Sequence, residues 1–211
     1  MQVTLENIGK RFNREWIFKD MHKEFKSEVR CALLGSNGSG KSTLLQIISG
    51  YLTPSTGTVH WKDEHSTYSV DTIFKQVAIA SPALGLYEDF TLRENIAFFQ
   101  NFKSLRNNIS LEEVAERIQL SKHIDKPLKH FSSGMKQRVK LGLAILSDTS
   151  LLLLDEPTSH LDANATKWYQ ELLGAEIEGR SLFVASNSHE EEIFLCQERI
   201  HMEEYKSFNH K

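Results

Sequence analysis

Two kinds of apolar pattern divide the chain. Nearly continuous apolar runs, which are typical of buried strands in a parallel sheet, occupy residues 29–34, 77–80, 151–154 and 182–185. The first 33 residues hold smaller apolar groups, and these predict short strands separated by turns at residues 3–8, 16–18 and 21–25. The pattern predicts an α/β fold with a central, mainly parallel sheet and an N-terminal antiparallel β subdomain.

The spacing of apolar residues changes from about residue 84. Thr91 and Glu94 have the spacing of a capping box, and the apolar residues that follow recur at helical intervals. A second long helical pattern covers residues 135–146. We therefore expect a helical subdomain inserted into a single domain. The expected boundaries are about 84–147 for the helical subdomain, and about 1–83 and 148–211 for the catalytic core.

A glycine-rich loop between an expected strand and an expected helix is the strongest chemical signal. It fits the pattern G-x-x-x-x-G-K-[ST] of the phosphate-binding P-loop. Its residues are Gly35, Ser36, Asn37, Gly38, Ser39, Gly40, Lys41, Ser42 and Thr43. Glycines let the backbone N–H groups converge on a phosphate, and the helix N-terminus adds its dipole. Lys41 supplies a positive charge to the outer phosphates and Ser42 a hydroxyl to Mg²⁺. A glycine-rich turn that merely precedes a lysine is the alternative.

Two acids follow the apolar run at residues 151–154. Ligands of open α/β sheets bind beyond the carboxyl ends of the strands, so Asp155 is placed to hold Mg²⁺. Pro157 should push Glu156 towards an extended conformation, which could aim its carboxylate at an attacking water. Acids that only favour the N-terminus of a following helix are the alternative.

Ser132, Ser133 and Gly134 precede the long helical pattern. A serine there can cap the helix, and the free N–H groups make a second potential anion site. Taken alone, this stretch fits an ordinary capped helix with a solvated basic face better. Phe12 lies in an expected turn, where its ring could stack on a nucleotide base or plug the end of a hairpin.

Composition narrows the function class. The chain has 211 residues with 25 Lys and Arg against 28 Asp and Glu, so a net charge of −3 argues against a non-specific nucleic-acid binder. Its two cysteines form no disulfide framework, which fits a reducing, cytosolic setting, and Cys31 is most simply a core residue. The sequence shows no signal peptide and no run of about 20 apolar residues, so work at a membrane would need a partner.

These motifs, in this order and spacing, resemble the ATP-binding subunit of ABC transporters over nearly the whole chain, which is a P-loop NTPase fold. Gly35 to Thr43 is similar to the Walker A motif of that family, and residues 131–138 to its signature sequence. Leu151 to Glu156 resembles the Walker B strand with the catalytic glutamate. Residues 159–162, which end at Asp162, resemble the D-loop.

The resemblance implies more than the residues do. Phe12 falls where the family has its adenine-stacking aromatic residue. Two domains would pair head to tail, a homodimer here, with each ATP between the P-loop of one and Ser132, Ser133 and Gly134 of the other. Closure and hydrolysis would drive a separate transmembrane permease, on which the protein would sit at the cytoplasmic face of the membrane. Phe90, Phe98, Phe99 and Phe102 could partly line the dock, although helix core is the simpler role for most.

Three positions depart from the family pattern. Ser81 stands where a glutamine is expected and would reach Mg²⁺ only through water. Met135 stands in the signature sequence, where a thioether cannot replace the hydrogen bonds of an amide. Asn187 stands where a histidine is expected; it can donate to phosphate but carries no positive charge, and His189 could replace it only if the loop is repositioned. We therefore expect hydrolysis that is slow without a partner.

Two other function classes stay open at this point. One is a soluble ABC-type ATPase that acts on a non-membrane partner such as a ribosome, DNA or a cofactor-assembly complex. The other is a nucleotide-dependent regulatory module with slow turnover, which the residues at positions 81 and 187 would suit. A GTPase is disfavoured because the chain has no N-K-x-D motif.

Overall fold

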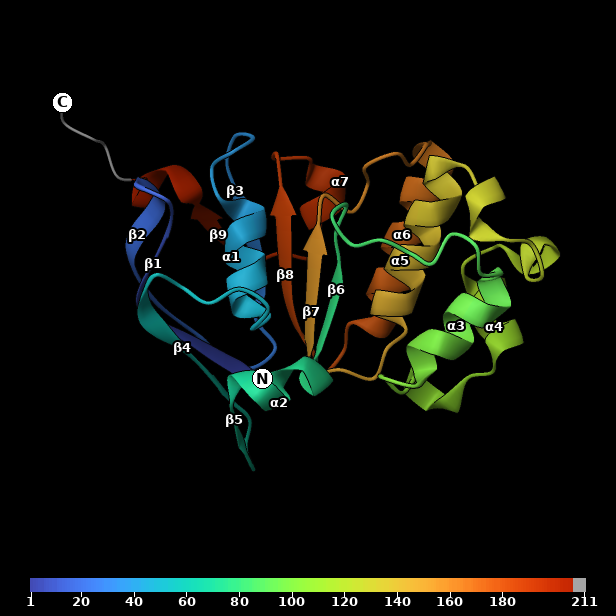
Figure 1. Cartoon of the computed structure of the whole chain (residues 1–211), viewed down its shortest axis with the longest axis horizontal. Helices are drawn as coiled ribbons and strands as arrows, with labels where there is room; N and C mark the ends of the chain where they lie inside the picture. Colours follow the sequence, from blue (N-terminus) through green and yellow to red (C-terminus); the bar gives the residue numbers. More distant parts are fainter. Residues whose placement is uncertain (207–211) are drawn as a thin grey trace.

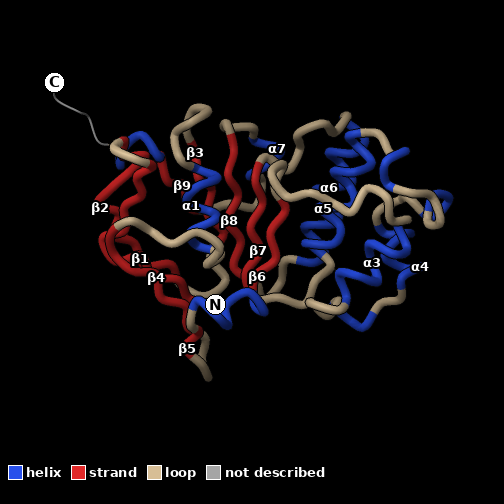
Figure 2. Tube along the Cα trace, in the orientation of Figure 1, coloured by secondary structure: helices blue, strands red, loops and turns tan. Residues whose placement is uncertain are grey.

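The computed structural model describes residues 1–206. The chain forms two sheets and a group of helices, arranged side by side along the longest axis of the molecule (Figure 1). Figure 2 shows strands gathered in the centre and at one end, and helices at the other. The last five residues of the expected catalytic core, 207–211, lie outside the described residues. No helix within residues 1–206 is long and apolar enough to cross a membrane.

Five strands form the central sheet, and every neighbouring pair is parallel. In order across the sheet they are β6 (Val77–Ala80), β7 (Leu151–Asp155), β8 (Ser181–Ser186), β3 (Arg30–Leu34) and β9 (Glu198–His201). The carboxyl ends of parallel strands lie at one edge of a sheet, and here this edge carries the loop after β3 and the acid that ends β7. The predicted parallel sheet is confirmed.

The N-terminal sheet pairs its strands antiparallel. Its order is β2 (Glu15–Phe25), β1 (Gln2–Phe12), β4 (Thr56–Lys62) and β5 (Thr67–Tyr68). The prediction of two strands at 16–18 and 21–25 was wrong, because β2 is continuous. Asp20 has a φ of 58°, and the register with β1 slips between the pairs Ile8–Met21 and Lys10–Phe18. The polar residues Lys19 and Asp20, which separate the two expected strands, therefore form a bulge within one strand.

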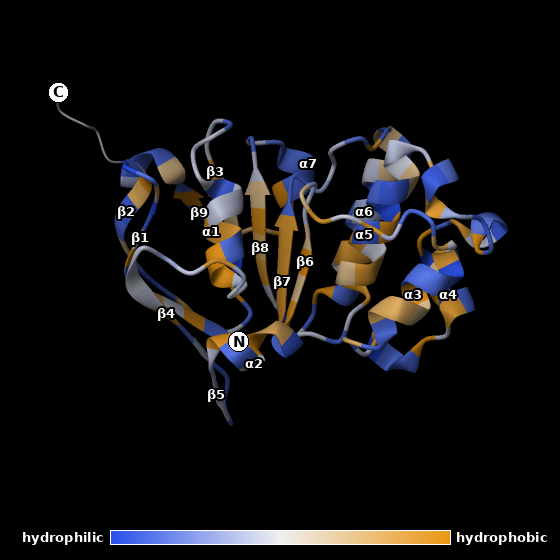
Figure 3. Cartoon of the chain, in the orientation of Figure 1, coloured by the Kyte–Doolittle hydropathy of each residue, from blue (hydrophilic) through white to orange (hydrophobic). Residues whose placement is uncertain are grey.

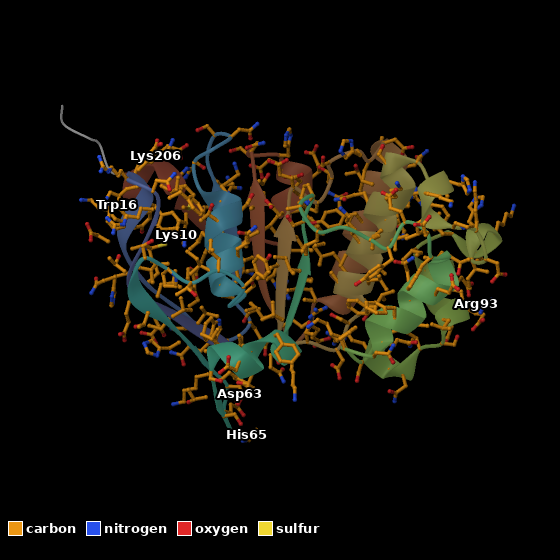
Figure 4. The ribbon with its side chains drawn as sticks, viewed as in Figure 1. Lys10, Trp16, Asp63, His65, Arg93 and Lys206 are labelled. Atoms are coloured by element: carbon orange, nitrogen blue, oxygen red, sulfur yellow. The ribbon has the colours of Figure 1, made fainter. Side chains whose placement is uncertain are left out.

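The helices connect and cover these sheets. They are α1 (Lys41–Ile48), α2 (Val70–Ile73), α3 (Leu92–Gln100), α4 (Leu111–Arg117), α5 (Ser133–Ile145), α6 (Ala163–Glu176) and α7 (Glu190–Ile193). Thr91 caps α3 in the predicted capping box with Glu94, which is confirmed. Arg93, at the outer end of the helical part (Figure 4), joins α3 to its surroundings through ion pairs with Glu112 and Asp125.

Alternation of side chains along the strands divides the interior into two cores. Leu151 and Leu153 of β7 pack in the core that includes α1 and the antiparallel sheet. Leu152 and Leu154 of the same strand pack in the core that includes α5 and α6. A continuous apolar run on β7 is needed because both faces of a central parallel strand are buried. In Figure 3 the strands of the central sheet are coloured as apolar, while the outer loops are largely polar.

Candidate nucleotide-binding site

The loop between β3 and α1 has a backbone shape that requires glycine. Gly40 has a φ of 103°, and a Cβ on it would lie 2.7 Å from Cγ2 of Ile17. Lys41 follows and begins α1, so its Nζ folds back over the loop and donates to the carbonyl oxygens of Gly35 at 2.7 Å and Ser36 at 3.1 Å. Burial lowers the pKa of Lys41, and the nearby Glu156 opposes this shift.

A hollow of about 340 Å³ opens beside this loop, within the size range of small-molecule sites. Its lining residues are Ile17, Asn37, Gly38, Gly40, Lys41, Ser42, Thr43 and Glu156. Three of these belong to the loop and three to the first turn of α1, and Glu156 joins them from the end of β7. Gly35 and Ser36 line an adjoining hollow together with Asn187, and Ser39 is buried.

Asp155 lies between two serine hydroxyls. Ser42 donates to its Oδ1 at 3.0 Å, and Ser81 donates to its Oδ2 at 3.0 Å. The three residues come from α1, the end of β7 and the position after β6, so the parallel sheet brings them together. Burial raises the pKa of Asp155, and the two serine hydrogen bonds oppose the shift.

This oxygen cluster suits Mg²⁺. The ion takes oxygen ligands and usually binds through one or two protein groups plus substrate phosphates. Ser42, Ser81 and Asp155 present four side-chain oxygens close together beside the loop. Residues 1–206 contain no group of three or more His, Cys, Asp or Glu side chains that could hold a metal alone. A cation here would therefore depend on phosphate oxygens for the rest of its ligands.

Asn187 joins the loop lysine to the acid after β7. Lys41 Nζ donates to its Oδ1 at 2.8 Å, and its own Nδ2 donates to Oε1 of Glu156 at 3.2 Å. His189, the alternative at this position, instead donates its backbone N–H to Ser186 Oγ at 3.2 Å.

Glu156 corrects one prediction. The residue before Pro157 was expected to be extended, but its φ is 46°, in the left-handed region that non-glycine residues rarely adopt. Its backbone N–H donates to the carbonyl of Ala185 at 2.9 Å, and its carbonyl accepts from Ser159 at 3.0 Å. These bonds hold the chain in a tight turn at the end of β7. Strained backbone of this kind is common at functional sites.

Other expected site residues lie away from the loop. Ser132 caps α5 by accepting from the N–H of Met135 at 3.2 Å, and Ser133 and Gly134 form the first turn of that helix. Asp162 caps α6 by accepting from Ala165 at 2.8 Å. None of Ser132, Ser133, Gly134 and Asp162 lines the hollow at the loop. In Figure 1 the central strands separate α5 from α1.

Phe12 also lies outside the lining of the hollow. It ends β1 with 49% of its surface exposed, and Lys10 Nζ lies 5.2 Å from the centre of its ring. In Figure 4 Lys10 and Trp16 both lie in the antiparallel sheet, at the end of the molecule away from the helical part. Ile17 of β2, which the sequence did not single out, is the apolar residue that lines the hollow.

Three further polar residues hold the site from outside it. Gln137 of α5 donates to the carbonyl of Pro157 at 3.0 Å. Glu203, in the short helix Met202–Tyr205, accepts from the N–H of Ser36 at 2.9 Å. Glu192 of α7 contacts Thr158. No local pattern marks these residues, because each is recognised only by a partner distant in the chain.

Comparisons with known proteins agree with this geometry. A family model described as ABC transporter matches residues 18–159. The probable sulfate/thiosulfate import ATP-binding protein CysA of Chlorella vulgaris is 32% identical, over 98% of this chain and 89% of the relative. The xylose/arabinose import ATP-binding protein XacJ of Haloferax volcanii is 32% identical over 77% of this chain, and the match spans only 43% of that relative's length.

A solved structure shows the same fold. The putative ABC transporter ATP-binding protein from Pyrococcus furiosus superposes with a TM-score of 0.80 at 16% identity, covering 98% of this chain and 100% of that one. At this identity the likeness concerns the fold, while the family match rests on the sequence. The chain therefore belongs to the ABC transporter family and is one of its ATP-binding, ATP-hydrolysing domains.

Proposed function

We propose that this protein is the subunit of an ABC transporter that couples Mg²⁺-dependent ATP hydrolysis to the movement of a separate membrane permease. The observation that carries the proposal is the line of hydrogen bonds from Lys41 through Asn187 to Glu156 beside the P-loop. It brings a cation, a neutral amide and a carboxylate to one side of the hollow.

Each of the residues at and beside the P-loop has a role in binding or hydrolysing ATP. The loop N–H groups and Lys41 bind the triphosphate, and Glu156 orients the attacking water and accepts its proton. Asn187 donates to charge that develops on the transferred phosphate. Ser42, Asp155 and Ser81 would hold Mg²⁺, which would neutralise phosphate charge there. Phe12 stacks on the adenine base.

Four of the expected site residues act on the nucleotide of a second copy, namely Ser132, Ser133, Gly134 and Asp162. They do not line the hollow of their own chain, so a head-to-tail homodimer is the arrangement in which they reach a phosphate. The capped start of α5 has free N–H groups that suit an anion. One structural relative is described as a bacterial Atm1-family ABC exporter with ATP bound; it superposes with a TM-score of 0.74 at 20% identity and shares the fold.

An aromatic cluster on the helical part is the proposed permease contact. Tyr87 and Phe90 stack with ring centres 5.2 Å apart, and Phe98 lies 4.7 Å from Tyr87 and 5.1 Å from Phe102. Phe102 is 61% exposed and Tyr87 53% exposed, which is unusual for large aromatic side chains. Phe99 instead packs partly buried against the core.

A second hollow connects the helical part near this aromatic cluster to Ser81, one of the residues that we propose for Mg²⁺. It has a volume of about 200 Å³, and its lining includes Ser81, Leu84 and Phe99. A permease segment seated there would touch the residue after β6 that contacts Asp155. We place the protein in the cytoplasm, on the inner face of the membrane through the permease, with the core at 1–83 and 148–211 and the helical subdomain at 84–147.

A pull-down from mildly solubilised native membranes tests the proposal, with partners identified by mass spectrometry. Near-stoichiometric recovery of a polytopic membrane protein supports it. Recovery with ribosomal, DNA-bound or assembly proteins in the soluble fraction overturns it in favour of a soluble ABC-type ATPase. Phosphate release from ATP and Mg²⁺ by the purified protein, with Lys41→Ala as the inactive control, tests the enzymatic part.

A further inference from the structure

Glu192 is a buried carboxylate that the roles above do not use. It lies on α7 and is 2% exposed. One oxygen, Oε1, accepts from the backbone N–H of Thr158 at 3.1 Å and from its Oγ1 at 2.7 Å. The other oxygen accepts from the hydroxyl of Ser186. A buried carboxylate is costly unless such bonds compensate for the lost water.

Its partners flank the two site residues that face each other. Ser186 directly precedes Asn187, and Thr158 follows Glu156 after one proline. A single carboxylate therefore ties the turn that carries Asn187 to the turn that carries Glu156. The hydrogen bond of 3.2 Å between Asn187 Nδ2 and Glu156 depends on the separation of these turns.

The backbone that carries this carboxylate is held in place as well. Tyr169 of α6 donates from its buried hydroxyl to the backbone carbonyl of Glu192 at 3.0 Å, which fixes α7 against α6. On the other side, Gln137 of α5 holds the carbonyl of Pro157 at 3.0 Å. The turn after β7 is thus anchored by Gln137 from α5 and by Glu192 from α7, and α7 is itself bonded to α6.

We propose that Glu192 is a positioning residue that sets the distance between Asn187 and Glu156 and so controls the hydrolysis step. This inference rests on the proposed function. Glu192 touches neither the loop nor the hollow beside it, so it acts on turnover and not on nucleotide binding.

The variant Glu192→Gln tests this with little change of shape. Its amide oxygen can still accept from Thr158, but its NH₂ group cannot accept from the hydroxyl of Ser186, which therefore loses its buried acceptor. We expect kcat for ATP hydrolysis to fall about tenfold or more, because small misplacements of catalytic groups cost up to about 10²-fold. The Kd for ATP should stay within about threefold of wild type.

Glu190→Gln is the matched control. It lies on the same helix and loses the same charge, but its side chain is exposed and pairs with Arg199 at the surface. We expect wild-type kcat from it. Thr158→Val removes the Oγ1 donor from the other side of the contact, and it should lower kcat without adding fully to Glu192→Gln.

Two results overturn the inference: wild-type kcat in Glu192→Gln, or kcat and ATP affinity that fall by the same factor together with a large loss of thermal stability. If Glu192→Gln does not fold, Thr158→Val decides, and unchanged kcat in that variant refutes the role. Absence of ATPase activity in the wild-type protein refutes the proposed function itself, which separates the two failures.

Discussion

Lys41 and Asn187 are joined by a hydrogen bond of 2.8 Å although 146 positions separate them in the chain. Lys41 begins α1 after β3, and Asn187 follows β8, the strand that pairs with β3 in the central sheet. The asparagine amide also donates to Glu156. An amide offers a donor and an acceptor without a charge, so it can contact a cation and a carboxylate at the same time.

The position of Asn187 between Lys41 and Glu156 predicts how its variants behave. Asn187→Ala removes one donor from the reacting phosphate, so we expect kcat to fall about 100-fold with ATP affinity little changed. Asn187→Asp keeps the acceptor for Lys41 but adds a negative charge beside Glu156 and the triphosphate, and should weaken ATP binding as well. Phosphate release and equilibrium binding measure the two effects. Full turnover in Asn187→Ala would contradict the role.

Glu156→Gln should trap an ATP-bound dimer. The amide cannot accept a proton from water, so ATP stays bound between the P-loop of one copy and α5 of the other. Size-exclusion chromatography with light scattering should show a dimer with ATP and Mg²⁺ and a monomer without nucleotide. Lys41→Ala in the same background is the control and should stay monomeric. A strictly monomeric Glu156→Gln at saturating ATP and Mg²⁺ would argue against the head-to-tail dimer.

Glu203 should support ATP binding from behind the loop. It accepts from both the N–H and the hydroxyl of Ser36, and the carbonyl of Ser36 in turn holds Lys41. These hydrogen bonds, led by the backbone N–H of Ser36, lower the pKa of Glu203. We expect Glu203→Ala to raise the Kd for ATP roughly three- to tenfold, the cost of about one hydrogen bond. Glu204→Ala, an exposed neighbour, should bind ATP like wild type in the same titration.

The lowered pKa of Lys103 predicts that the stability of the fold depends on pH. Its ammonium group donates to the carbonyls of Phe74 and Val77, both at 2.5 Å, and burial lowers its pKa to about 8. The unfolded chain, with an ordinary lysine pKa near 10.4, binds more protons between these values, so stability should rise with pH in that window. Thermal unfolding from pH 7 to 10 should show Tm of wild type rising relative to Lys103→Gln. If Tm changes with pH in the same way for wild type and for Lys103→Gln, the lowered pKa of Lys103 is excluded.

Arg180 predicts a structural effect far from the nucleotide. It is 2% exposed, donates to the last carbonyls of α5 at Ile145 and Ala144, and also reaches Thr149. Arg180→Ala removes the side-chain donor from the buried carbonyl of Ile145, while Ala144 and Thr149 keep their contacts with the hydroxyl of Ser147. With the loss of the charged hydrogen bonds, we expect about 3 kcal/mol of destabilisation. For a domain of this size Tm should fall roughly 6–12 °C. Arg14→Ala, on an exposed turn, should change Tm little.

The P-loop could be found in the sequence because its chemistry is contiguous. Glycines, Lys41 and Ser42 act through backbone shape and neighbouring atoms, and the structure shows the strand, loop and helix that the pattern predicts. Asp155 could be found for a similar reason, since it ends an apolar run long enough to mark a buried strand. The roles of these residues in binding ATP and Mg²⁺ stay predictions.

Other parts could not be predicted from local pattern. The extended conformation expected for Glu156 failed because its backbone bonds to Ala185 on the neighbouring strand override the preference of a residue before proline. The continuous β2 was missed because pairing with β1 accommodates Asp20 as a bulge. Both outcomes depend on strand partners that no window of sequence contains.

The sequence by itself determined the family, the α/β fold and the residues of the P-loop, because periodicity and motif spacing are properties of consecutive residues. Only the tertiary structure decided that Asn187 lies between Lys41 and Glu156, that Ser81 reaches Asp155, and that Glu192 and Glu203 hold the turns around them. The physical reason is that a parallel sheet collects the ends of strands that are far apart in the chain, and hydrogen bonds then form between whichever side chains meet at that edge.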